Sequence, residues 1–211
     1  LDRESTDWFS VTDAKRDELA MEAINEVIDE YAGFGIFDTA ESQHSISHMK
    51  AVFKQTVWAL TTQIRRGSFV PERFEFSFYE SLDMANDVTV DIKGRVDRTD
   101  TYTDEGRLFV KVLDYKSGNT VFDLVKLYYG TQLQLAVYMD AVMEQKKEAL
   151  KQVSVEPGGM LYYRIDDPVI DLKDVTPGTE LSEEEINQMI LKKLKPDGLI
   201  NSDEKAYRGM D

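Results

Sequence analysis

Apolar and polar positions along the first third of the chain predict two helices. Over residues 13–31 the apolar side chains recur every three or four positions, the period of an α-helix; they are Leu19, Ala23, Ile24, Val27 and Tyr31. A second set with the same period predicts a helix over residues 45–66; it consists of Ile46, Met49, Phe53, Val57, Leu60 and Ile64.

Three strand-like segments follow, because the pattern changes to alternation. Residues 73–79 alternate phenylalanine with polar side chains. Residues 87–101 also alternate, through Val88, Val90 and Ile92, before they reach Gly94. Residues 107–116 are nearly all apolar until Asp114, which is typical of a strand inside a sheet. Thr-Asp-Glu-Gly at 103–106 predicts a hairpin turn between the last two strands.

The remaining pattern predicts further helices and one more strand. A long helix is expected over residues 121–150, with a stripe formed by Leu124, Tyr128, Leu135, Met139 and Val142. Residues 160–165 form an expected short buried strand, and Ser182 with Glu185 forms a capping box that begins a helix ending before Pro196. The polar residues 197–211 are expected to be loosely held. The order helix, three strands, helix, strand predicts an α/β fold on a mixed sheet (α+β), flanked by extra helices.

Composition narrows the classes of protein that fit this pattern. A length of 211 residues with 42% apolar and 31% charged residues suits one globular domain, 1–211. No apolar run approaches the roughly 18 to 20 residues that span a bilayer, so no membrane partner is expected. No signal peptide is visible, and a start without Met indicates a fragment of a longer chain. The lack of cysteine excludes cysteine-ligated metal within this stretch and suits the cytoplasm.

The net charge of −15 argues against DNA binding by this chain alone, so a partner is expected to supply the DNA-binding surface. The candidate chemistry nevertheless lies on the hairpin. If the turn centres on Asp104 and Glu105, Asp97 lies opposite Val112, and Asp114 is two positions further along the same face. Such diagonal neighbours have Cβ atoms roughly 7 to 8 Å apart. Lys116 shares that face, so two carboxylates and one amine are expected on one patch of sheet.

Two close carboxylates repel each other, and a divalent cation relieves that cost. Oxygen ligands without His or Cys suit Mg²⁺ or Mn²⁺, and a nearby lysine can orient or deprotonate water, or hold a phosphate oxygen. The alternative is an ordinary surface ion pair between Asp114 and Lys116; the apolar strand before them favours a functional site. For Gly94, the alternative is a glycine that permits close packing. Gln134 and Tyr138 share a helical face, whereas Gln132 points elsewhere as a structural or exposed residue.

Three motifs in this order carry a family resemblance. They are Gly-Arg-Val-Asp-Arg at 94–98, Leu-Asp-Tyr-Lys-Ser-Gly at 113–118, and Tyr-Tyr-Gly-Thr-Gln-Leu-Gln-Leu at 128–135 with Tyr138. The sequence resembles the RecB-like branch of the PD-(D/E)XK nuclease superfamily, and within it the C-terminal nuclease domain of AddB (RexB-type) subunits of bacterial ATP-dependent helicase–nucleases. The resemblance implies a restriction-endonuclease-like core over about 45–165.

The resemblance also implies roles for five residues. Asp97 and Asp114 match the metal ligands, Lys116 matches the catalytic lysine, and Gln134 with Tyr138 matches the motif that helps to hold DNA or order the active site. The implied activity is that of a Mg²⁺- or Mn²⁺-dependent DNA exonuclease in double-strand break repair. The implied partners are DNA and an AddA-type helicase–nuclease subunit.

The sequence departs from the family pattern in two places. Neither His44 nor His48 follows glycine at the spacing of the family's Gly-X-X-X-His motif. They are either exposed residues at a helix start, or the motif lies upstream of this chain. The cysteines that hold an iron–sulfur cluster in AddB-type domains either lie elsewhere in the full-length protein or are lacking. Glu75, on the polar face of its strand, is a candidate for a further family carboxylate.

Three functions therefore remain open. The first is an active nuclease domain of a helicase–nuclease. The second is a catalytically inactive nuclease-like module used for assembly or DNA guidance. The third is a stand-alone RecB-like exonuclease of the CRISPR-associated type, against which the start without Met and the lack of cysteines count.

Overall fold

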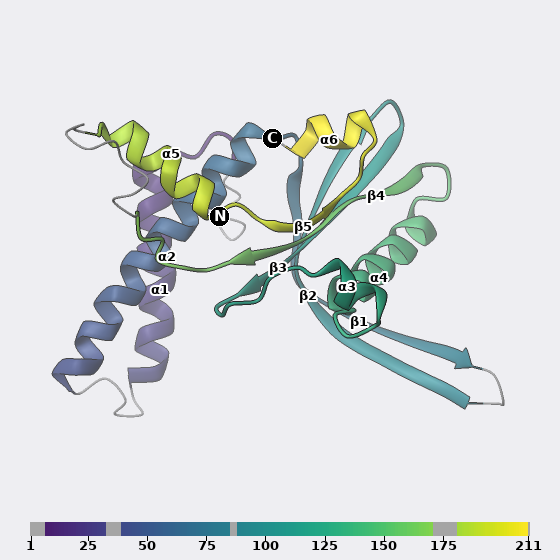
Figure 1. Cartoon of the computed structure of the whole chain (residues 1–211), viewed down its shortest axis with the longest axis horizontal. Coiled ribbons are helices and arrows are strands. Elements are labelled where there is room, and N and C mark those ends of the chain that lie inside the picture. Colours follow the sequence, from purple (N-terminus) through teal and green to yellow (C-terminus); the bar gives the residue numbers. More distant parts are fainter. Residues whose placement is uncertain (1–6, 33–38, 85–87, 171–180, 211) are drawn as a thin grey trace. The chain divides into compact units, whose positions relative to one another are not determined.

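The computed structural model describes residues 7–32, 39–84, 88–170 and 181–210 (Figure 1). Their contacts divide the chain into two compact units. A helical unit contains Leu1–Arg66 and Ile165–Lys195, and a sheet unit contains Gly67–Arg164 and Pro196–Asp211. The expected single domain over 1–211 stays a prediction.

The helical unit confirms the helices expected from apolar periodicity. Helix α1 spans Asp13–Ala32 and α2 spans Ala40–Arg66, which begins five residues before the expected position. Helix α5, Glu183–Lys193, begins with the expected capping box: Glu185 N donates to the Ser182 hydroxyl, and the Glu185 carboxylate accepts from Ser182 N. In the described part of the chain, no helix has the length and apolar character needed to cross a membrane.

The sheet unit contains a five-stranded mixed sheet in the order β1-β2-β3-β4-β5. Its strands are β1 Val70–Met84, β2 Val88–Asp104, β3 Arg107–Lys116, β4 Ser154–Arg164 and β5 Asp197–Ile200. Strands β3 and β4 are parallel, and the other neighbours are antiparallel. This arrangement confirms the expected α/β fold on a mixed sheet. In Figure 1 the β1–β2 ribbon extends well past the other strands of the sheet.

The turn between β2 and β3 sets the register of the candidate site. Glu105 and Gly106 both have positive φ, 45° and 77°, as in the two-residue turns that favour glycine in hairpins. The turn lies one residue later than expected, so Val112 pairs with Thr99 and Leu113 pairs with Arg98. The expected pairing of Asp97 with Val112 is therefore wrong by two residues. Because side chains alternate with a period of two, this shift preserves the face and brings position 97 beside Asp114.

The long helix expected over 121–150 is wrong, because the chain is interrupted. Helix α3 spans Leu124–Tyr128 and α4 spans Gln134–Ala149. Between them Gly130 adopts φ +75°, a left-handed conformation that ends a helix and suits glycine. Tyr128 is 83% exposed, so the buried stripe begins only in α4.

The expectation that residues 197–211 are loosely held is also wrong. Strand β5 pairs with β4 from Gly159 to Tyr162, and helix α6, Glu204–Met210, follows it. Strand β4 begins at Ser154, six residues before the expected position 160. It can continue through Pro157 because the register shifts there, and a proline without an N–H is tolerated at such an irregularity.

Helices cover both faces of the sheet unit. On one face the buried cluster joins β3 to α4; its members include Val110, Val112, Leu135, Met139 and Val142. On the other face Phe69 and Phe109 pack with Ala206 of α6. Both helices lie against the sheet in Figure 1. Side chains that alternate along β3 therefore enter two different environments.

Candidate active site

Three of the predicted site residues form one bonded group at the end of β3. Asp114 is 2% exposed, and its Oδ1 accepts a hydrogen bond from Gln134 Nε2 at 2.9 Å. Its Oδ2 lies 2.5 Å from the Lys116 ammonium. Lys116 Nζ also donates to Gln134 Oε1 at 2.9 Å. Gln134 thus bridges the carboxylate and the amine.

Tyr138 holds the other end of this group. Gln134 Nε2 donates to the Tyr138 hydroxyl at 2.9 Å, since residues four apart share one face of α4. The Tyr138 ring packs edge-on against Phe78, with ring centroids 5.9 Å apart. A Cβ at Gly94 would lie 2.7 Å from the Phe78 ring and 3.2 Å from Tyr138. This confirms the close-packing interpretation of Gly94, and that packing places the Tyr138 ring.

Asp97 joins the site through the backbone of β3. Its Oδ2 accepts a hydrogen bond from Tyr115 N at 2.7 Å, and Tyr115 lies between Asp114 and Lys116 in the sequence. The negative charge of Asp97 is close enough to contribute to the raised pKa of Asp114. The structure therefore brings both predicted metal ligands together.

The electrostatics of Asp114 are those of a poorly compensated carboxylate. Burial raises its pKa above the ordinary value, Lys116 opposes that rise, and Asp97 adds to it. Its Oδ2 is buried and pairs with the Lys116 ammonium, yet the pKa stays raised in spite of that partner. A buried carboxylate beside a second carboxylate is a position where a cation would be favourable.

The donor set fits Mg²⁺ or Mn²⁺. Both ions prefer oxygen ligands, and Mg²⁺ is commonly held by one or two carboxylates, with water and phosphate oxygens completing its shell. Asp97 and Asp114 supply two such carboxylates. Within the described ranges no group of three or more His, Cys, Asp or Glu side chains is placed to hold a metal, so water and substrate would complete this shell.

Lys116 remains accessible although its neighbours are buried. Its side chain is 25% exposed, against 3% for Asp114, and its ammonium lies 5.4 Å from the centre of the Tyr162 ring. The amine therefore sits at the boundary between the buried carboxylate and solvent. From there it can reach a water molecule or a phosphate oxygen.

The structure does not bring Glu75 or the histidines into this group. Glu75 is 60% exposed, pairs with Arg95 Nε at 2.7 Å and has φ +52°. His44 and His48 are exposed on α2 in the helical unit, which confirms their expected exposure; because α2 begins at Ala40, His48 lies in its third turn and the expected position at the helix start is wrong for it.

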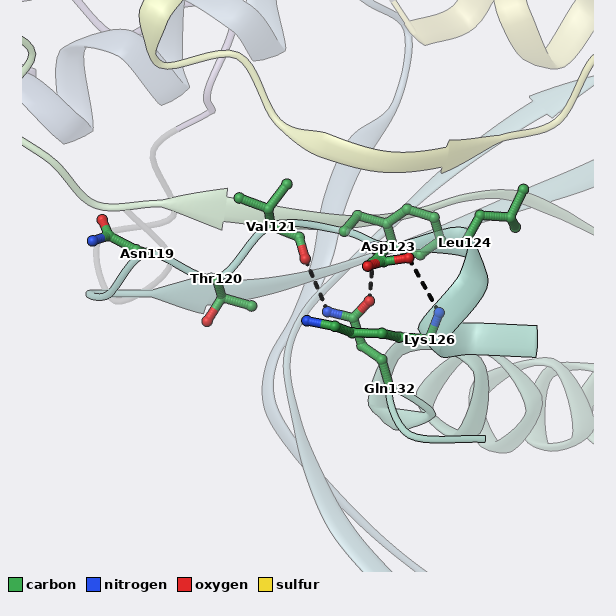
Figure 2. Close-up of a pocket in the computed structure, with 8 residues that line it drawn as sticks. Asn119, Thr120, Val121, Asp123, Leu124, Lys126 and Gln132 are labelled. Atoms are coloured by element: carbon green, nitrogen blue, oxygen red, sulfur yellow. Dashed lines mark hydrogen bonds between the residues drawn. The ribbon is translucent and has the colours of Figure 1, made fainter. Parts of the chain in front are cut away.

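A pocket of about 680 Å³ lies in the segment between β3 and α4, lined by residues 119–124, Lys126 and Gln132 (Figure 2). Gln132 Oε1 accepts from Asp123 N at 2.8 Å, and its Nε2 donates to Val121 O at 3.0 Å. Asp123 in turn caps α3. These bonds confirm the structural interpretation of Gln132, which ties the segment that joins Lys116 to Gln134.

A second charged cluster, which the motifs did not predict, lies on the opposite face of β2 and β3. We call it the buried network: Arg98, Asp100, Lys111 and Tyr115. Arg98 donates twice to the Asp100 carboxylate, each at 2.7 Å, and Lys111 Nζ lies 3.0 Å from Asp100 Oδ2. Arg98 Nη1 also donates to the Tyr115 hydroxyl at 2.9 Å. One signal in the sequence could have found it, because Lys111 interrupts an otherwise apolar strand at a position of opposite parity to Asp114.

Charges in the buried network compensate one another. Burial alone would raise the pKa of Asp100, but the attraction of Arg98 and Lys111 outweighs it and holds that pKa below the ordinary value. Burial lowers the pKa of Lys111, although Asp100 opposes that effect. The network is thus a closed set of partners, unlike the group around Asp114.

Comparison with known proteins agrees with this geometry. A family model described as the PD-(D/E)XK nuclease superfamily matches residues 7–206. A protein of Alkaliphilus metalliredigens, named as the B subunit of an ATP-dependent helicase/deoxyribonuclease, is 35% identical over 99% of this chain and 18% of its own length. A protein of the same name from Lachnoclostridium phytofermentans is 36% identical over 92% of this chain and 16% of its own length.

A third relative of that name, from Caldanaerobacter subterraneus, is 29% identical over the whole chain and 18% of its own length. The chain thus spans less than a fifth of the curated relatives that it matches. Together these matches confirm the resemblance to the AddB-type subunits of helicase–nucleases and the restriction-endonuclease-like fold. Because the family model matches nearly all of it, the chain belongs to the PD-(D/E)XK nuclease superfamily.

Proposed function

We propose that this chain is a Mg²⁺- or Mn²⁺-dependent DNA nuclease domain in which Asp97 and Asp114 hold the ion. The observation that carries the proposal is the state of Asp114. Its carboxylate is buried beside a second carboxylate, and its pKa is raised although Lys116 pairs with one of its oxygens. A cation held by both carboxylates would relieve each of these costs.

The bound ion would supply charge stabilisation at the phosphodiester and a lowered pKa for bound water. The protein's own contribution centres on Lys116, whose side chain orients the attacking water, takes its proton when the amine is neutral, or holds a phosphate oxygen. Gln134 keeps that amine beside Asp114 through its two hydrogen bonds. Tyr138 fixes the Gln134 amide and so limits the positions that Lys116 can take.

The wider role extends this proposal to the longer protein. In that role it would be an exonuclease acting on DNA ends in double-strand break repair, in the cytoplasm, with an AddA-type helicase–nuclease subunit. The names of the relatives, B subunits of ATP-dependent helicase/deoxyribonucleases, support the deoxyribonuclease activity and the helicase partner. The net charge of −15 supports the need for a partner that grips DNA. An iron–sulfur cluster would require cysteines outside this chain.

Cleavage of linear DNA in Mg²⁺ tests the proposal. Lys116→Ala should lower the rate by at least about a hundredfold, the usual lower bound for loss of a general acid or base. Lys147→Ala is the matched control, because Lys147 is exposed in the last turn of α4 and should leave cleavage unchanged. Equal cleavage by wild type and Lys116→Ala would refute the assignment of Lys116.

A catalytically inactive module is the second candidate. The strong net negative charge favours it, as does the lack of the Gly-X-X-X-His motif in this sequence. Mn²⁺ titration by calorimetry separates the candidates: a folded chain that takes up no Mn²⁺ would support the inactive module. A stand-alone exonuclease is the third candidate, which a helicase-like region upstream in the gene would exclude.

A further inference from the structure

The buried network lies where charge is costly and has no direct part in the proposed chemistry. Arg98, Asp100 and Lys111 are 2%, 0% and 8% exposed. Well-packed apolar residues commonly stabilise a fold as much as a buried ion pair does or more, so stability alone gives no reason for such a set. A buried polar network does, however, fix geometry more narrowly than apolar packing.

Tyr115 connects this network to the candidate metal ligands. Its hydroxyl accepts a hydrogen bond from Arg98 Nη1 at 2.9 Å on the buried face. Its backbone N–H donates to Asp97 Oδ2 at 2.7 Å. The two residues that flank it are Asp114 and Lys116, whose side chains project from the opposite face of the strand. One residue is therefore held at its side chain by Arg98 and at its backbone by Asp97.

We infer that Arg98 and Tyr115 are positioning residues that set the Asp97 carboxylate against Asp114; this inference rests on the proposed function. The Arg98 guanidinium is fixed by two hydrogen bonds to Asp100, and it therefore holds the Tyr115 hydroxyl in one position. A fixed tyrosine side chain restricts rotation of its own peptide unit. The N–H of that unit then fixes the position of Asp97 Oδ2 through its hydrogen bond. The other oxygen of the Asp97 carboxylate would remain available to the ion.

The neighbouring strand offers a matched control for this inference. Tyr163 pairs with Tyr115 in the β3–β4 register, and the two rings pack edge-on with centroids 5.8 Å apart. The Tyr163 hydroxyl is buried and, among the residues described, has no hydrogen-bond partner. Tyr115→Phe and Tyr163→Phe therefore remove the same atom from the same layer, but only the first breaks a bond.

Calorimetric titration of the 211-residue chain with Mn²⁺ provides the first readout. Removing a residue that orients a ligand typically weakens metal binding about 10- to 100-fold. We expect weakening in this range for Tyr115→Phe and unchanged affinity for Tyr163→Phe. Equal affinities in the two variants would overturn the inference. Arg98→Lys is a second variant, which keeps a positive charge beside Asp100 but loses the fork that reaches Tyr115; it should weaken Mn²⁺ binding as Tyr115→Phe does.

Hydrogen exchange of the residue 115 amide in the metal-free chain provides a readout that does not depend on the ion. That amide should exchange at least about tenfold faster in Tyr115→Phe than in wild type, because its bond to Asp97 opens more often. Tyr163→Phe should leave it unchanged, and no difference between the variants would contradict the positioning role. If wild type binds no Mn²⁺, the proposed function fails, whereas the exchange experiment still decides the inference.

Discussion

The same two strands, β2 and β3, carry two groups of charged residues that differ in how completely their charges are compensated. In the buried network, each charged oxygen of Asp100 has a cationic partner, and the pKa of Asp100 is lowered. At the candidate site, Asp114 is similarly buried and has one cationic partner, Lys116, but the burial and the nearby Asp97 raise its pKa. Burial of a carboxylate is thus common to both groups, and compensation distinguishes them.

The difference separates a carboxylate whose charge is compensated within the protein from one whose charge is not. Asp100 can stay charged in the metal-free fold because its cationic partners are already present. Asp114 is compensated only in part, which costs stability until a ligand arrives, as expected where activity and stability compete. Four experiments test this distinction, in order of decreasing effect.

Neutralising one aspartate in each group gives the strongest contrast. Asp100→Asn leaves Arg98 and Lys111 buried without their counter-charge, so the free energy of unfolding should fall by about 3–5 kcal/mol. Asp114→Asn should change it by no more than about 1 kcal/mol, since Lys116 can turn to solvent. Urea denaturation measures both. A loss for Asp114→Asn as large as that for Asp100→Asn would erase the distinction.

Two glutamines, two positions apart, provide a second contrast. Gln134→Ala should reduce cleavage about 10- to 100-fold, because Gln134 orients both Lys116 and Asp114. Gln132→Ala removes two bonds to the backbone and should cost about 1–3 kcal/mol of unfolding free energy while cleavage stays within a few-fold. Kinetics and denaturation on both variants test this, and the reverse pattern would contradict the roles.

Acid should weaken the buried network in a defined direction. Because the folded-state pKa of Asp100 lies below the ordinary value of 3.8, the stability that it confers is fully present above that pH. As pH falls below 3.8 toward the folded pKa, the stability advantage of wild type over Asp100→Asn should shrink by up to about 1.4 kcal/mol per pH unit. A difference that is constant down to the acid transition would show that the charge of Asp100 contributes nothing.

The weakest effect should come from the turn that serves both groups. Gly106 has φ +77° and open space where a Cβ would lie, so Gly106→Ala should cost about 1–2 kcal/mol through backbone strain alone. Since the turn sets the register of β2 and β3 for both groups, Mn²⁺ affinity should not change while the fold is intact. Calorimetry beside thermal unfolding would detect a change in affinity, which would indicate that the register had moved.

Local patterns predicted the strands and the site better than they predicted the connections. A nearly continuous apolar run identified β3 with its correct bounds. The hairpin register and the family motifs grouped Asp97, Asp114, Lys116, Gln134 and Tyr138, although the register was off by two. That error did no harm, because a shift of two positions preserves the face. A shift of one position would have placed Asp97 and Asp114 on opposite faces of the sheet.

What the sequence could not predict depends on contacts distant in the chain. The helix break at Gly130 opposes the apolar period that continues through it, and a single glycine inside a helical pattern is a weak signal. The pairing of β5 with β4 depends on partners that no local window contains. In the sequence, Arg98 and Asp100 resemble charges exposed to solvent. They are buried by contacts with β3, including Tyr115 and Lys111, which lie more than ten residues away in the chain.

During synthesis the edge of β4 is unpaired for some time, because β5 is made later than β4. Residues 165–196 separate β4 from the strand that pairs with it, and β5 covers Gly159–Tyr162 only after that stretch has been made. At about 5–20 residues per second on the ribosome, the edge of β4 stays open for roughly 2 to 6 seconds. During that interval β4 is an unpaired edge next to apolar residues, the kind of surface on which nascent chains aggregate.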